Sequence, residues 1–203
     1  TERYDILERW DLNLNFPSVA GSMMMGEREI TYGYSSGIYA RHNAKRANIK
    51  IVPTQEEIDA LGGGITAGDW ERRFELAYNE AKDRDVVAAI GVTQTMLQFA
   101  SYLKRKHGVY PKDLWDIDLL ICTSIAGIQT KYKPALRAVY GDAAIVEMYG
   151  ATEGMYAQQL DEKPYLVPHY DTYFFEVQTG GGVKMHHELR RGEYGSVIVS
   201  SCL

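Results

Sequence analysis

One short segment carries most of the chemistry that the sequence suggests. The apolar run 144–148 predicts a buried strand, and residues 149–154, with the sequence YGATEG, follow it as a predicted turn. In open α/β sheets, ligands bind beyond the carboxyl ends of the strands. The turn would offer an aromatic ring, backbone amides flanked by glycines, one hydroxyl and one carboxylate at that edge.

These groups suit a magnesium nucleotide. The Tyr149 ring can pack against a flat base, and the Thr152 hydroxyl and neighbouring amides can donate hydrogen bonds to phosphate oxygens. The Glu153 carboxylate can hold Mg²⁺, which prefers one or two carboxylates together with phosphates and waters. The residues alone leave a second interpretation open, in which this is a glycine-flanked turn with a solvated glutamate.

The YGATEG segment resembles the strand-end motif of the adenylate-forming superfamily. That superfamily includes acyl-CoA synthetases, phenylacetate–CoA ligases and the plant acyl-acid amido synthetases that conjugate auxin and jasmonate. Gly154 and the later runs 165–168 (YLVP) and 173–177 (YFFEV) look most like the amido synthetase branch. The resemblance covers residues 86–203 well and residues 1–85 only by position.

The resemblance implies an ATP-dependent reaction in which a carboxylic acid becomes an acyl-adenylate and then passes to an amine or to the thiol of CoA. The implied cofactors are ATP and Mg²⁺, with CoA as one candidate acceptor. Thr152 and Glu153 would be catalytic, and Glu153 would bind the metal. The implied nucleotide-binding residues are Thr123, Ser124, Tyr149, Gly150, Ala151 and Thr152. At Thr123-Ser124, the glycine that is usual in the family is replaced.

Three parts of the family pattern have no counterpart in these 203 residues. They are the Ser/Thr/Gly-rich phosphate loop, the aspartate that holds the ribose hydroxyls, and the mobile C-terminal domain. We therefore expect the chain to be a central fragment of the large N-terminal domain of a longer ligase, and to be inactive in isolation.

The pattern of elements predicts an α/β fold. Helical and strand-like segments alternate over residues 70–149, which favours a mainly parallel sheet flanked by helices. Short strand-like runs joined by turns follow, so residues 156–203 are expected to form an antiparallel or barrel-like part of the same domain as residues 1–155. We expect a short helix at residues 1–10. Further along the chain, we expect a capping box from Thr54 to Glu57 at the start of one helix, and Asp69 as the cap of the next helix.

Bulk composition excludes several classes of partner. The net charge is −5 and no basic stripe is present, which argues against nucleic acid. No apolar run reaches the 18 or more residues of a membrane span. Cys122 and Cys202 show neither metal nor redox spacing, as expected for reduced thiols in a cytoplasmic protein. The oligomeric state is left open.

Two other classes of function are weighed. Residues 33–37 match G-x-S-x-G, the nucleophile elbow of serine hydrolases, with Ser35 as nucleophile and Asp171 and His186 as triad partners. The polar segment 27–32 is unlike the buried strand that an elbow needs, so a Ser/Gly loop is favoured. A non-catalytic binding or scaffold fragment is the other alternative. The pair His186-His187 is expected in a strand, where the two rings would point to opposite faces and not to one metal.

Overall fold

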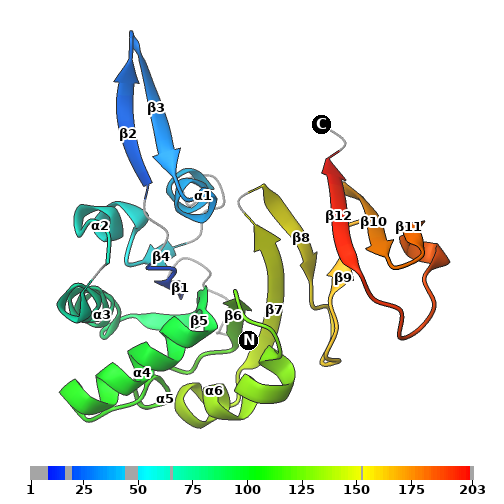
Figure 1. Ribbon diagram of the computed structural model, residues 1–203. Coiled ribbons are helices and arrows are strands. Elements are labelled where there is room, and N and C mark those ends of the chain that lie inside the picture. Colours follow the sequence, from blue (N-terminus) through cyan, green and yellow to red (C-terminus); the bar gives the residue numbers. More distant parts are fainter. Residues whose placement is uncertain (1–8, 17–19, 44–49, 65, 152, 202–203) are drawn as a thin grey trace.

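The computed structural model describes residues 9–16, 20–43, 50–64, 66–151 and 153–201, and shows the predicted α/β architecture. Its main sheet has the strand order β4-β1-β5-β6-β7-β8-β9 (Figure 1). The first five strands pair in parallel, and β8 and β9 extend the sheet in antiparallel fashion. The strands are β1 (Arg9–Leu14), β4 (Lys50–Val52), β5 (Asp85–Val92), β6 (Leu119–Thr123), β7 (Ala144–Ala151), β8 (Gly154–Gln158) and β9 (Val167–Pro168).

Helices pack on one face of the parallel strands (Figure 1). They are α3 (Ala67–Ala81), α4 (Thr93–His107), α5 (Pro111–Leu114), the π-helical turn η2 (Ile128–Tyr132) and α6 (Lys133–Tyr140). Alternate strand residues such as Leu12, Leu120 and Ile145 meet Phe99 and Leu136 in this layer, and all five are buried. Each such side chain contributes roughly 1.5–3 kcal/mol by burial, so this layer anchors the sheet.

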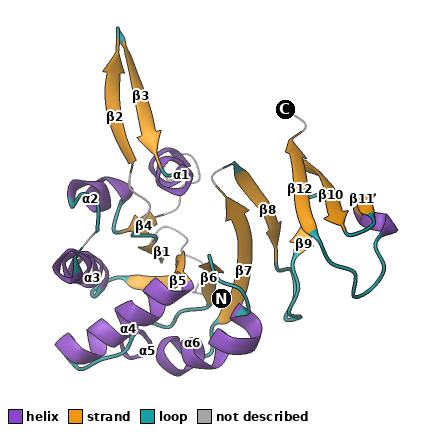
Figure 2. Cartoon of the chain, viewed as in Figure 1, coloured by secondary structure: helices purple, strands orange, loops and turns teal. Residues whose placement is uncertain are grey.

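Two further groups of elements complete the described part of the chain. The first is a hairpin of β2 (Ala20–Met25) and β3 (Arg28–Gly33), followed by α1 (Ser35–Asn43) and α2 (Gln55–Ala60). The second is an antiparallel sheet in the order β11-β10-β12 (Figure 2), formed by β10 (Tyr173–Thr179), β11 (Gly182–Met185) and β12 (Ser196–Ser201), with the 3₁₀ turn η3 (His186–Glu188) after β11. None of the described helices is long and apolar enough to span a membrane.

The two predicted helix starts have different outcomes. The capping box of α2 is confirmed, because Thr54 Oγ1 accepts from the Glu57 amide at 3.3 Å and Glu57 Oε2 accepts from the Thr54 amide at 2.7 Å. Asp69 is not the N-cap of α3; Thr66 is, and Asp69 reaches back to the Thr66 amide at 2.8 Å as the other half of a second capping box. Asp69 is thus the third residue of the helix and the acidic partner of its cap.

Two other local predictions are wrong. Residues 9 and 10 begin strand β1, so the helix expected over residues 1–10 is contradicted where it can be tested; residues 1–8 lie outside the described residues. Apolar residues at every second position, from Trp10 to Phe16, explain the strand. His186 and His187 lie in a 3₁₀ turn and not in a strand. The division of the chain at residue 155 stays a prediction. β8 and β9, which lie at and after this position, belong to the main sheet.

Candidate functional site

The YGATEG segment forms the end of a β-hairpin and not a loop after a strand. β7 is longer than predicted and runs through Ala151, and β8 begins at Gly154. The first half of β7 pairs in parallel with β6 as far as Glu147, whereas residues 148–151 of β7 pair antiparallel with β8. The paired residues 148–151 and 154–158 therefore project beyond the carboxyl edge of the parallel strands, and we call them the arm. Thr152, the predicted phosphate ligand, lies outside the described residues.

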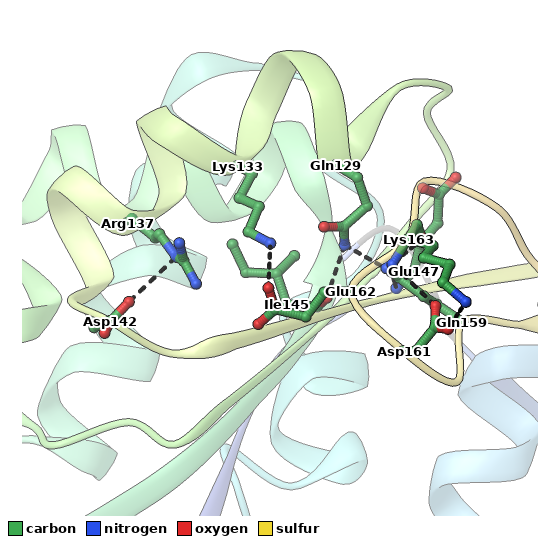
Figure 3. Close-up of polar contacts among 10 residues, drawn as sticks. All are labelled: Gln129, Lys133, Arg137, Asp142, Ile145, Glu147, Gln159, Asp161, Glu162 and Lys163. Carbon is green, nitrogen blue, oxygen red and sulfur yellow. Dashed lines mark hydrogen bonds and ion pairs between the residues drawn. The ribbon is translucent and has the colours of Figure 1, made fainter.

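A buried glutamine holds β7 where its pairing changes from parallel to antiparallel (Figure 3). The Gln159 amide donates to the Glu147 carbonyl at 2.9 Å, and Gln159 Oε1 accepts from the Glu147 amide at 3.1 Å. Gln129 Nε2 donates both to Gln159 Oε1 at 2.6 Å and to the Ile145 carbonyl at 2.7 Å. Gln159 is 4% exposed, and its Nε2 donates to the Lys163 carbonyl at 2.9 Å. These bonds fix the direction in which the arm leaves the sheet.

The arm presents the expected aromatic ring and carboxylate to solvent. Tyr149 is 48% exposed, and its ring centroid lies 5.8 Å from that of Tyr156. Glu153 is also exposed, in the turn. The pKa of Tyr156 is raised, first by burial and then by the negative charge of Glu153.

The second predicted segment, Thr123-Ser124, ends the neighbouring strand β6. Thr123 Oγ1 lies 3.2 Å from Ser124 Oγ, and the Thr123 carbonyl accepts from Thr93 Oγ1, at the start of α4, at 3.2 Å. Ser124 has φ of +70°, in the left-handed region that favours glycine. This conformation costs a non-glycine residue roughly 1–2 kcal/mol, and such strain is most common at functional sites.

Pairing in the sheet decides which predicted residues share a face. Cys122 pairs with Glu147 and is buried under α4, where its Sγ contacts Met96 Sδ at 3.8 Å. Because strand side chains alternate, Glu147 and Tyr149 face the same side as Cys122, whereas Thr123 faces the other side. The structure thus brings the Ser124 turn and the arm to one edge of the sheet, but it separates the Thr123 side chain from the Tyr149 ring.

Glu147 is a candidate that the sequence did not reveal. Its carboxyl lines a hollow of about 260 Å³ between the loop after β6 and the segment before β9. The other lining residues are Ala126, Gly127, Gln129, Thr130, Pro164, Tyr165 and Leu166. Burial raises the pKa of Glu147. A carboxylate in such a place can accept a hydrogen bond from a ligand donor, and its only sequence signal was an acidic residue inside an otherwise apolar run.

The structure bears on two further hypotheses, a metal site and a serine-hydrolase nucleophile at Ser35. Among the described residues, no group of three or more His, Cys, Asp and Glu side chains could hold a metal ion by itself. A single carboxylate such as Glu153 still fits Mg²⁺ when the ligand's phosphates supply further oxygens. Ser35 begins α1 and does not lie in the predicted loop. The strand before it, β3, is largely exposed and, among the described residues, pairs with β2 alone. This context differs from the buried central strand of a nucleophile elbow.

Neither protein-family models nor curated proteins match this sequence. Solved structures do match. One is 2-hydroxyisobutyryl-CoA ligase in the postadenylation state with 2-HIB-AMP, with a TM-score of 0.64, 15% identity, and coverage of 94% of this chain and 35% of that one. The same ligase with 2-HIB-AMP and CoA in the thioesterification state gives a TM-score of 0.63 and 14% identity over 96% of this chain and 35% of that one.

A benzoate CoA ligase from Burkholderia xenovorans LB400 also matches, with a TM-score of 0.57 and 11% identity over 96% of this chain and 33% of that one. The chain shares its fold with these ligases. It spans only about a third of their length, and at this level of identity the likeness concerns the fold. The expected likeness to the amido synthetase branch stays a prediction.

Proposed function

We propose that this chain is part of an ATP-dependent ligase of the adenylate-forming superfamily, which activates a carboxylic acid and transfers its acyl group. The observation that carries the proposal is the β7–β8 arm. It holds the YGATEG segment beside the strained Ser124 turn at the carboxyl edge of a parallel sheet, in a fold shared with CoA ligases. Ligands of open α/β sheets bind at this edge.

In the proposed first step, a carboxylate oxygen of the substrate attacks the α-phosphorus of ATP, and pyrophosphate leaves. The Tyr149 ring packs against the adenine, and the amides of Gly150 and Ala151 with the Thr152 hydroxyl lie at the phosphates. Ser124 and the backbone of Thr123 would border the adenine and acyl pocket, since the Thr123 side chain faces the other side of the sheet. Glu153 would hold Mg²⁺, which when bound neutralises charge on the phosphates. Most of the rate enhancement then comes from positioning and electrostatic stabilisation.

In the second step, a nucleophile attacks the acyl carbon and AMP leaves. Two acceptor classes are supported by different observations. 2-Hydroxyisobutyryl-CoA ligase, which has the same fold, was crystallised with CoA, and this favours a thiol. The runs 165–168 and 173–177 resemble the amido synthetases, which favours an amine. Supplying CoA or a panel of amino acids to the adenylate-loaded enzyme and identifying the product by mass spectrometry separates the two.

The test of the first step is Glu153→Gln in the full-length protein. The substitution keeps size and polarity but removes the charge, so carboxylate-dependent ATP–pyrophosphate exchange should fall about 10²–10³-fold, most strongly at low Mg²⁺. The thermal melt should hardly move, because an exposed substitution of this kind stays within about 0.5 kcal/mol.

Glu29→Gln, at an exposed position of β3, is the matched control and should leave exchange unchanged. Unchanged exchange in Glu153→Gln over the whole Mg²⁺ range, with an unchanged melt, would remove Glu153 from the site. Lost exchange with a collapsed melt would show that Glu153 has a structural role instead.

A further inference from the structure

Three tyrosines connect the arm to the second sheet. The Tyr149 and Tyr156 rings lie 5.8 Å apart on the two strands of the arm. Tyr156 in turn meets the ring of Tyr173, from β10, edge to face at 5.1 Å and 80°. Tyr149 and Tyr156 belong to the main sheet, whereas Tyr173 belongs to the sheet of β10, β11 and β12. The three rings therefore connect the candidate site to a part of the chain outside the main sheet.

Tyr173 also lies directly against the turn of the arm. A Cβ atom added at Gly154 would lie 2.9 Å from Tyr173 Cζ and closer still to the hydroxyl oxygen, nearer than real Cβ atoms approach their neighbours. The Gly154 backbone is not in the left-handed region. A larger residue at position 154 would therefore displace the Tyr173 ring, whereas the backbone conformation itself does not demand glycine.

The arm needs such a contact. At its base, Ala157 and Gln158 also pair with β9, but residues 150–151 and 154–155 pair only with each other among the described residues, and isolated two-stranded hairpins are at best marginally stable in water. Tyr149 and Met155 are 48% and 40% exposed, so the arm has little core of its own. A contact at Gly154, next to Glu153, is well placed to limit movement of the turn.

We propose that Tyr173 is a positioning residue for the reaction, which fixes the turn carrying Glu153 by packing on Gly154 and Tyr156. This inference rests on the proposed function. Reacting groups displaced by about 1 Å can lose about 10²-fold in rate, so a residue that never touches the substrate can control the chemical step. Loss of Tyr173 should therefore lower kcat of the exchange reaction more than it changes KM for ATP.

The experiment uses the full-length protein with Tyr173→Leu, Tyr173→Phe and a control, Tyr194→Leu, at a position that is 89% exposed. We expect Tyr173→Leu to lower kcat about 10–100-fold, and Tyr173→Phe, which keeps the ring on Tyr156, to recover most of that loss. Amide hydrogen exchange at residues 153–157 should rise in Tyr173→Leu and not in the control. An unchanged kcat, or unchanged amide exchange, in Tyr173→Leu would overturn the positioning role.

A double-mutant cycle with Gly154→Ala tests whether the effect passes through the contact itself. Alanine at 154 clashes with Tyr173, so the single variant should lose activity, and the loss should shrink when Tyr173 is already leucine. Additive effects would overturn the inference. A wild-type enzyme without carboxylate-dependent exchange would instead refute the proposed function, which is a distinguishable result.

Discussion

Gln159→Leu should destabilise the protein by about 2–4 kcal/mol. The side chain is 4% exposed and makes three hydrogen bonds, to the Gln129 side chain, the Glu147 amide and the Lys163 carbonyl. Each contributes roughly 0.5–1.5 kcal/mol net, and leaving the part-buried Glu147 amide without an acceptor costs roughly 1–3 kcal/mol more. Leucine has a similar size and regains part of this by apolar burial.

Urea unfolding followed by circular dichroism measures the effect. With a slope of about 2–3 kcal/mol per molar urea, the midpoint should fall by about 1 M. Gln98→Leu is the matched control, because the same substitution on the exposed face of α4 should stay within about 0.5 kcal/mol. If the Gln159→Leu midpoint falls no further than that of the control, the glutamine does not hold β7 at its change of pairing.

Two more predictions concern titrating groups. The pKa of Glu75 is lowered, chiefly by the hydrogen bond from Tyr102 and also by His107, so its stabilisation is present above the unfolded pKa of about 4.3 and is lost as pH falls through the folded value. Glu75→Gln should therefore reduce the loss of unfolding free energy at acid pH, by about 1 kcal/mol or less because the Glu75 side chain is 38% exposed. An unchanged dependence of the unfolding free energy on acid pH would contradict this prediction. Burial raises the pKa of Cys122 to about 12, so in a Cys202→Ser background the thiol should react with a disulfide reagent at pH 8 only after urea unfolding, and prompt reaction of the native protein would refute its burial.

The central parallel strands could be predicted because runs of apolar residues leave a local signal. The runs in β5, β6 and the first half of β7 are nearly continuous in apolar residues, as expected for central strands. Strand β1 lacks that signal, because Asp11 and Asn13 alternate with Trp10 and Leu12, and its partner β5 lies far along the chain. This alternation of apolar and polar residues is itself typical of a strand with one buried face, and it contradicts the helix expected over residues 1–10.

The candidate site was predictable in composition but not in shape. Tyr149 and Glu153 lie in one short segment, so the sequence alone predicts that they are close in space. The glycines at 150 and 154 also suggested a turn, whereas pairing with β8 extends the strand through Gly150. Glu147, Gln129 and Gln159 come from three separate segments, and no local pattern indicates that they meet. The side on which Thr123 lies likewise depends on the register of β6 against its neighbours.

The change of pairing along β7 has a consequence for how the protein folds. The β7–β8 arm closes over a very short stretch of chain, and hairpins of this kind form in about 1–10 μs. The parallel pairs β1–β5 and β5–β6 join residues that are far apart in sequence, and such non-local contacts form much more slowly. The pairing of β7 with β8 can therefore form early and transiently, and its direction relative to β6 is fixed once the sheet has assembled and Gln159 meets Gln129.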